Sequence, residues 1–338
     1  MGMRDKSAFV AGNKGVKIAA VIAHYDPTGK VSQSLIGLVH LFQARGIEVI
    51  FVSTNLDPTY EKTLSAAVKV ITRPNLGYDF CSYKLGIEKL QDVSVLDRLI
   101  LLNSSFIVLD PAKLLKNFIS KPQGPALRGL TLSYDIAPHI QSFWLSFETQ
   151  DLIGSHVFKQ WWTNVLPLAT KEEIIRNYEI GLSQWFSYHH IPLSAPIGLR
   201  KKMILKPAIQ DLSEASKQYV AEIVRVYEQL PEVNSLQESL KRLKKLLDPA
   251  RVWTHLVYIN PIRPRRYLHL IKMHWNKAKR EFINLNPAHH SWTLVYRRFA
   301  ILKIGLIAHN PTHQDLRPFY ENASAKELAL VQDALGQH

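Results

Sequence analysis

The chain has 338 residues, of which 46% are hydrophobic and 21% charged, a composition typical of folded globular proteins that excludes a mainly disordered chain. Cys81 is the only cysteine, which excludes an internal disulfide and favours a reducing compartment. The formal net charge is +14, and residues 200–310 contribute 21 basic and 8 acidic side chains, a surplus of 13. A positive field concentrated in one region attracts nucleic acid, anionic lipid head groups or pyrophosphate-bearing substrates.

The sequence offers no segment that we expect to cross or enter a membrane. Residues 1–15 are polar and charged, without the apolar core of a signal peptide. The most apolar run, residues 299–309, is interrupted by Lys303 and is shorter than the roughly 18 residues that a membrane-spanning helix needs. We therefore expect a soluble or peripheral protein.

Strand patterns alternate with helix patterns over the first half of the chain. Short β-branched runs predict strands, and apolar residues at helical spacing predict the helices between them. Such alternation is typical of parallel βαβ units, so we expect an α/β fold with a mostly parallel sheet. The expected strands are 17–23, 48–53, 69–72 and 99–102, followed by 129–133 and 141–147; the expected helices are 32–44, 59–68, 79–90, 158–165 and 171–188.

The pattern changes near residue 200, after which we expect mainly helices. Residues 236–247 are amphipathic, with four basic side chains at positions 241, 242, 244 and 245 among leucines. Residues 264–283 and 291–307 repeat this mixture of basic and aromatic side chains. One interpretation is a surface that docks on an anionic membrane; the alternatives are a solvated helical face and a nucleic-acid-binding surface.

Polar clusters follow three of the predicted strands, where ligands bind in open parallel sheets. The first cluster is His24-Tyr25-Asp26. The Asp26 carboxylate is placed to accept a hydrogen bond from a base or a ribose hydroxyl, as in nucleotide-binding folds. The alternative is an ordinary turn, because Asp-Pro and Thr-Gly pairs favour turns.

The second cluster is residues 73–80, between the third strand and its helix. Gly77 permits close approach of a ligand to the backbone, and the Arg73 guanidinium suits a diphosphate through paired hydrogen bonds. The alternative is a capped helix start with Asp79 as N-cap, which leaves Arg73 and Tyr78 unexplained.

The third cluster is Asn103-Ser104-Ser105. Metal-dependent sugar transferases often have an Asp-x-Asp pair at this place, because two carboxylates hold a divalent cation against the donor diphosphate. This chain lacks the pair, and Asp110 is either a substitute ligand or part of a loop.

Two further patterns lie in the second half of the predicted sheet domain. Glu179 falls in a helix rich in apolar residues, where a carboxylate is either a general base near a sugar acceptor or an exposed surface group. His139, Gln141 and Ser142 precede an aromatic strand, and they suit either sugar binding or a packed core.

Together these clusters resemble the rhamnan synthesis F family of bacterial polysaccharide glycosyltransferases. The resemblance extends over five motifs in the same order and over a C-terminal Asn-Pro-Ala-His-His-Ser-Trp and Asn-Pro pair, from about residue 17 to residue 311. The motifs are residues 24–26, 73–80, 101–105, 139–143 and 178–183. The family's acidic residue after Asn103 is Ser104 here, which leaves the need for Mg²⁺ or Mn²⁺ open.

The resemblance implies a GT-A-like, Rossmann-related fold that uses a nucleotide-sugar donor as co-substrate. It implies Glu179 as catalytic base and two sets of binding residues. The donor would be bound by His24, Asp26, Arg73, Asn75, Gly77, Tyr78, Asp79, Asn103 and Ser105, and the acceptor by His139, Gln141 and Ser142. The expected organisation is a tail at 1–16, a nucleotide-sugar domain at 17–200, a basic helical region at 201–311 on the acceptor side, and a tail at 312–338.

From this we expect transfer of a sugar, rhamnose or another deoxysugar, from a nucleoside diphosphate to a lipid-linked or growing cell-surface polysaccharide of the O-antigen, lipopolysaccharide, capsule or rhamnan type. The expected location is cytoplasmic, peripheral on the inner face of the bacterial inner membrane, with no nucleic-acid partner. The alternatives are a non-catalytic member that assists polysaccharide assembly, suggested by Ser104, and a nucleic-acid-binding protein.

Overall fold

The computed structural model describes residues 16–118, 124–133, 136–198, 285–289 and 291–336. Its contacts divide the chain into two units, Met1–Gly198 together with Leu285–His338, and Leu199–Asn284. The second unit holds most of the predicted basic helical region and lies outside the described residues. The helices, the membrane-docking surface and the nucleic-acid alternative assigned to residues 201–284 therefore stay predictions.

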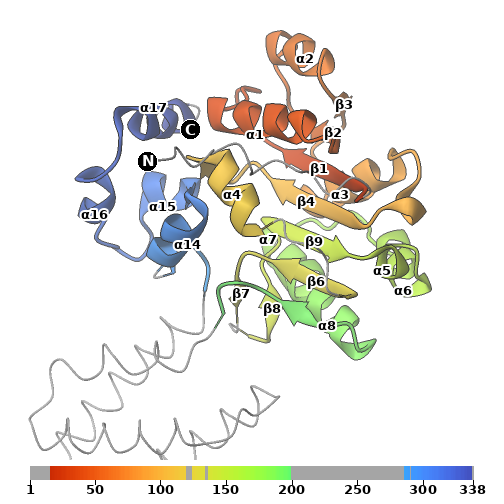
Figure 1. Cartoon of the computed structure of the whole chain (residues 1–338). Coiled ribbons are helices and arrows are strands. Elements are labelled where there is room, and N and C mark those ends of the chain that lie inside the picture. The colour runs from red at the N-terminus through yellow and green to blue at the C-terminus, as the bar shows by residue number, and fades with distance from the viewer. Residues whose placement is uncertain (1–15, 119–123, 134–135, 199–284, 290, 337–338) are drawn as a thin grey trace, which may run out of the picture. The chain divides into compact units, whose positions relative to one another are not determined.

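A seven-stranded, mostly parallel sheet forms the centre of the first unit (Figure 1). Strand β1 pairs in parallel with β2 and β4, whereas β9 runs antiparallel to both β4 and β6. In sheet order the strands are β10 (Leu193–Ser194), β6 (Ala126–Gly129), β9 (Trp144–Glu148), β4 (Arg98–Asn103), β1 (Ile18–His24), β2 (Glu48–Ser53) and β3 (Lys69–Thr72). The predicted mostly parallel sheet is confirmed.

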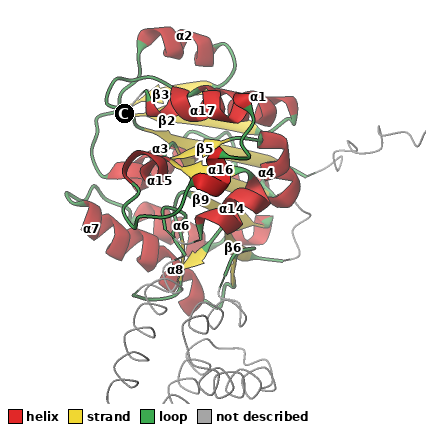
Figure 2. Ribbon diagram, turned by 90° about the vertical axis from the view of Figure 1, so that its left-hand side faces the viewer, coloured by secondary structure: helices red, strands yellow, loops and turns green. Residues whose placement is uncertain are grey.

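Helices cover both faces of the sheet because alternate side chains of each strand point to opposite faces and nearly all of them are apolar. In β1, Ala20 and Ile22 pack with one group of helices, and Ala19 and Val21 with the other. The first group is α1 (Gln33–Ala44), α2 (Pro58–Ser65), α4 (Pro111–Phe118) and α14 (Trp292–Phe299), and Figure 2 shows α1, α4 and α14 in front of the strands. The second group is α3 (Tyr78–Glu88), α5 (Gln150–Ile153), α6 (His156–Thr163), the π-helix η2 (Ile174–Ile180) and α8 (Gly181–Tyr188).

The C-terminal segment packs onto the same unit rather than forming a tail. Strand β11 (Ile301–Lys303) pairs antiparallel with β5 (Phe106–Val108), and α17 (Ala325–Leu335) lies beside α1 (Figure 1). The sequence pattern predicts that residues 291–307 are helical throughout. The structure differs because Ala300, at φ 53°, caps the end of α14, and β11 starts at the next residue. The remaining elements are η1 (Val93–Val95), β7 (Leu132–Ser133), β8 (His139–Ile140), α7 (Lys171–Glu173), α15 (Ile304–His309) and α16 (Arg317–Tyr320).

The described helices differ in length and apolarity from helices that span a membrane. Within the described ranges, no helix is both long enough and apolar enough to cross a bilayer.

Candidate functional site

The candidate site lies at the edge of the sheet where the parallel strands end. The strand β4 ends at Asn103, and its antiparallel neighbour β9 begins at Trp144, so the residues just before β9 reach the same edge. The backbone N–H of Asn103 donates to the carbonyl of Phe143 at 3.3 Å, which brings Ser142 next to the end of β4. Two predicted motifs, 101–105 and 139–143, therefore meet at one place although they lie about 40 residues apart in the sequence.

Asp79 and Asn103 are joined directly. The amide Nδ2 of Asn103 donates to Oδ2 of Asp79 at 2.7 Å, and its Oδ1 accepts from the Ser105 hydroxyl at 2.5 Å. Burial raises the pKa of Asp79, while the Asn103 hydrogen bond and the charge of Lys303 oppose that rise. Asp79 is not the N-cap of α3, because Gly77 holds that position with φ 70°. The capped-helix interpretation therefore leaves the Asp79 carboxylate unexplained, and its contact with Asn103 accounts for it.

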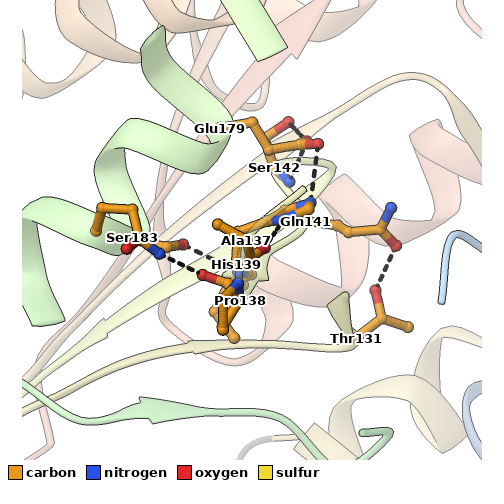
Figure 3. Close-up of polar contacts among 10 residues, drawn as sticks. Thr131, Ala137, Pro138, His139, Gln141, Ser142, Glu179 and Ser183 are labelled. Atoms are coloured by element: carbon orange, nitrogen blue, oxygen red, sulfur yellow. Dashed lines mark hydrogen bonds and ion pairs between the residues drawn. The ribbon is translucent and has the colours of Figure 1, made fainter. Parts of the chain in front are cut away.

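Glu179 is held against the same edge by Ser142 (Figure 3). Its Oε2 accepts from the Ser142 backbone N–H at 2.8 Å and from the Ser142 hydroxyl. The carbonyl of Ser142 in turn accepts from the Tyr83 hydroxyl at 2.9 Å. The pKa of Tyr83 is raised well above its usual value by burial and by the charges of Asp79 and Glu179, so Tyr83 remains a neutral donor.

The local backbone of Glu179 is unusual. Residues Ile174–Ile180 form a π-helix between the short helix α7 and α8, where the sequence predicts one regular helix over 171–188. Such π-helical turns are rare and occur frequently at functional sites, because the extra residue redirects the side chains of that turn. With 17% of its side chain exposed, Glu179 is neither a fully exposed surface group nor a core residue.

His139 faces the other oxygen of Glu179. Its Nδ1 donates to the carbonyl of Ala137 at 2.8 Å, and its Nε2 lies 3.6 Å from Glu179 Oε1 (Figure 3). Because the Ala137 carbonyl can only accept, Nδ1 carries a proton, and Nε2 is the ring nitrogen that faces Glu179. Gln141 is buried, and its Oε1 accepts from the Thr131 hydroxyl at 2.7 Å. His139 and Ser142 thus contact the predicted base, whereas Gln141 fixes the preceding loop.

Lys303 completes the site and was missed by the sequence analysis. Its Nζ donates to the Ser105 hydroxyl at 2.6 Å and lies 4.2 Å from the centre of the Phe143 ring. Burial lowers the pKa of Lys303 to about 8, while the charges of Glu179 and Asp79 oppose that change. The only signal in the sequence is a single lysine in an apolar run, which gives no indication of its distant partners.

The Arg73 guanidinium donates hydrogen bonds within its own loop. Its Nε donates to Ser82, Nη1 to the carbonyls of Pro74 and Leu76, and Nη2 to the carbonyl of Tyr78 at 2.5 Å. These bonds hold the loop that leads into α3; the predicted contact of Arg73 with a diphosphate stays a prediction. Gly77 is needed here, because a Cβ would lie 2.3 Å from the Cys81 sulfur. In the same loop, the side chains of Asn75 and Tyr78 are exposed.

His24 and Asp26 shape the loop after β1. The imidazole of His24 contacts Ser53 Oγ through Nδ1 and the Lys30 carbonyl through Nε2, both at 2.9 Å, and burial lowers its pKa to about 4. Asp26 Oδ1 accepts from the backbone and hydroxyl of Thr28 and from the Lys30 N–H. These contacts fit the turn interpretation of the cluster, and donor binding by these two residues stays a prediction.

The residues at the end of β4 do not supply a pair of carboxylates. Ser104 exchanges hydrogen bonds of 3.2 Å with the backbone of Tyr25, and Asp110 is exposed and accepts from the Lys113 N–H at 2.9 Å. In the part of the chain that the structure describes, no group of three or more His, Cys, Asp or Glu side chains is placed to hold a metal ion.

The segment that carries most of these residues was compared with protein families. Residues 49–191 match the model of rhamnan synthesis protein F. The resemblance found in the sequence is thereby confirmed over these residues. This segment of the rhamnan synthesis protein F type contains Asp79, Asn103, His139, Ser142 and Glu179, whereas Lys303 lies beyond it.

Solved structures with a related fold include several glycosyltransferases. Glucosyl-3-phosphoglycerate synthase from Mycobacterium tuberculosis is 15% identical, with a TM-score of 0.37, over 56% of this chain and 73% of its own. The glycosyltransferase GlyE from Streptococcus pneumoniae is 13% identical, with a TM-score of 0.35, over 62% of this chain and 52% of its own. Drosophila β1,4-galactosyltransferase 7, solved with manganese, UDP-Gal and xylobiose, is 10% identical, with a TM-score of 0.33, over 54% of this chain and 65% of its own.

This chain thus spans about half of GlyE and just under two thirds of the galactosyltransferase. A comparison with curated proteins finds no match.

Proposed function

We propose that this protein is a glycosyltransferase that moves a sugar from a nucleoside diphosphate to a hydroxyl group of an acceptor glycan, with Glu179 as general base. The observation that carries this proposal is the placement of the Glu179 carboxylate. Ser142 holds it at the carboxyl edge of a parallel sheet, inside the segment that matches rhamnan synthesis protein F. Ligands bind at that edge in open α/β sheets.

The geometry leaves one oxygen of Glu179 for the reaction. Both hydrogen bonds from Ser142 go to Oε2, so Oε1 is the atom that accepts the proton of an acceptor hydroxyl. The oxygen of that hydroxyl forms a bond to the anomeric carbon as its proton passes to Oε1. The Nε2 of His139 lies 3.6 Å from this oxygen, beyond hydrogen-bond distance, and so leaves it open to the acceptor hydroxyl.

The other product is the nucleoside diphosphate. The bond between the anomeric carbon and the diphosphate oxygen breaks, and its electron pair leaves with the diphosphate, so negative charge grows there in the transition state. Asp79 and Asn103, joined at 2.7 Å, are placed to bind hydroxyl groups of the donor sugar, since together they offer both acceptor and donor atoms.

The finer assignment extends this proposal to a deoxysugar such as rhamnose, to a lipid-linked or growing cell-surface polysaccharide, and to work at the inner face of the bacterial inner membrane. The family match and the basic surplus in residues 200–310 support this part.

The test is a comparison of turnover in two matched variants. We expect Glu179→Gln to lower the rate of nucleoside diphosphate release from a donor sugar by about 10²–10⁴-fold, because the amide cannot accept the proton. Donor affinity, measured by calorimetry across a panel of nucleoside diphosphate sugars, should change by less than about threefold. The free energy of unfolding should change little, because Gln keeps an acceptor oxygen for Ser142.

Glu172→Gln is the matched control, because Glu172 is exposed and lies seven positions earlier, in α7. Its turnover should equal that of the wild type. If no nucleoside diphosphate sugar binds, or if Glu179→Gln turns over at the wild-type rate, the proposal is wrong. Donor binding without any turnover in the wild type would favour a non-catalytic role in polysaccharide assembly.

A further inference from the structure

The position of Lys303 is not explained by packing alone. The residue ends β11, which is joined to β5 so that Lys303 pairs with Phe106 and the Ile304 N–H donates to the Ser105 carbonyl at 3.1 Å. This pairing aims the lysine at the end of β4, where its Nζ contacts Ser105 Oγ. A partly buried lysine with no ion pair costs stability, so its presence at the edge that binds ligands indicates a use.

The ammonium group of Lys303 retains binding capacity. An ammonium has three hydrogen-bond donors, and within the described ranges Nζ donates to the Ser105 hydroxyl at 2.6 Å. The face of the Phe143 ring lies on another side at 4.2 Å. Glu179 and Asp79 act on its charge, yet neither makes an ion pair with it within 4.0 Å in the described part of the chain. Two N–H groups therefore remain for an anionic ligand.

The same arrangement does not suit a divalent cation. Asp79 and Glu179 are the two carboxylates whose charges raise the pKa of Lys303. A Mg²⁺ or Mn²⁺ ion between them would be repelled by the ammonium. Asn103, Ser104 and Ser105 supply neutral oxygens in place of the carboxylates that such ions prefer. The residues described here thus do not fit a metal held against the donor.

We propose that Lys303 is the cation that binds the diphosphate of the donor, in the place that a divalent metal ion takes in metal-dependent sugar transferases. This inference rests on the proposed function. A lysine is a compact point charge and a common phosphate ligand, and its attraction is strengthened where water is partly excluded. As the bond to the anomeric carbon breaks, the electron pair stays on the diphosphate oxygen, and the two free N–H groups of Lys303 donate to the diphosphate.

The experiment measures binding of the diphosphates of uridine, thymidine and guanosine, and of the corresponding nucleosides, by calorimetry in EDTA. We expect the full-length protein to bind its preferred diphosphate without metal. Lys303→Met, which keeps the length of the side chain and removes the charge, should weaken that binding about tenfold or more, with nucleoside affinity unchanged. Lys303→Arg, which keeps the charge, should stay within about threefold of the wild type.

Lys326→Met is the surface control, because Lys326 is exposed at the start of α17, and it should bind like the wild type. The inference is overturned if EDTA abolishes diphosphate binding and Mn²⁺ or Mg²⁺ restores it, or if Lys303→Met binds within twofold of the wild type. In both of those cases the proposed function survives, whereas a wild type that binds none of the diphosphates refutes both. Should Lys303→Met fail to fold, the metal dependence of the wild type alone decides.

Discussion

The two ends of the strand pair β4 and β9 carry charged residues in contrasting arrangements. At one end, Arg98 and Glu148 lie opposite each other and are joined by hydrogen bonds of 2.6 to 3.0 Å, with Ser146 donating to the same carboxylate. At the other end, Glu179 and Asp79 are bound by neutral donors, and Lys303 stays beyond ion-pair distance of both.

This difference distinguishes structural charges from charges that are available to a ligand. A buried carboxylate in a paired, geometrically matched arrangement stabilises its surroundings only while the partner is present. Carboxylates that accept hydrogen bonds from neutral groups can still accept from another molecule. An ammonium without an ion pair can likewise still donate to another molecule. We therefore expect substitutions at the Arg98 end to change stability and substitutions at the Lys303 end to change binding and turnover.

The largest stability effect is expected at the paired end. Glu148→Ala leaves the Arg98 guanidinium buried without its carboxylate and should lower the free energy of unfolding by about 3–5 kcal/mol, measured by urea denaturation. The double variant Arg98→Met with Glu148→Leu removes both charges and should recover most of that loss. A loss below about 1 kcal/mol in Glu148→Ala would contradict the structural role.

A second test concerns His24, beside the site. Its pKa of about 4 in the folded protein lies below the usual 6.5, so between these values the unfolded chain binds a proton that the folded protein does not. Stability should therefore fall as the pH drops from 6.5 to 4, by up to about 3 kcal/mol. The dependence of the free energy of unfolding on pH should become weaker in His24→Gln. It should stay as in the wild type in His40→Gln, which changes an exposed histidine. Equal slopes in His24→Gln and wild type would exclude His24 as the source.

The smallest expected effect sharpens the comparison at the Lys303 end. Burial, with a smaller contribution from the charge of Lys171, lowers the pKa of Lys303 to about 8, and the charges of Glu179 and Asp79 oppose that change, so Lys303 loses its charge as the pH rises through 8. Diphosphate binding should weaken roughly tenfold by one pH unit above that value if the ammonium is required. Calorimetry from pH 7 to 9 should show this loss in the wild type and little of it in Lys303→Arg. An affinity independent of pH in the wild type would argue against a diphosphate bound to the ammonium.

Much of the sheet could be predicted because its strands are short apolar runs between clear turn signals. The strands at 48–53 and 69–72 agree with the structure residue for residue, and Ser32 caps the helix that was expected to start there. The antiparallel direction of β9 and the π-helix at Glu179 were not predicted, since both depend on long-range packing and neither leaves a periodic signal. Asp79 and Asn103 were expected at one edge because their clusters follow predicted strands, whereas Glu179 was expected near the site only from the resemblance.

The contacts of Arg73 and Lys303 show what residue type alone does not reveal. A guanidinium next to a glycine turn suggests a diphosphate ligand. In the structure, the guanidinium of Arg73 donates hydrogen bonds to carbonyl groups of its own loop. Lys303 lies in no motif that the sequence reveals, because its partner Ser105 is 198 positions away. The pairing of β5 with β11 brings the two residues into contact. Local sequence cannot state which distant strand a short apolar segment will join.

That separation also sets an order of events during synthesis. At about 5–20 residues per second, a ribosome adds Lys303 some 10–40 seconds after Ser105 and some 6–25 seconds after Glu179, so both acidic groups are synthesised before the amine. The edge of the sheet is therefore complete only after β11 has been synthesised and has paired with β5.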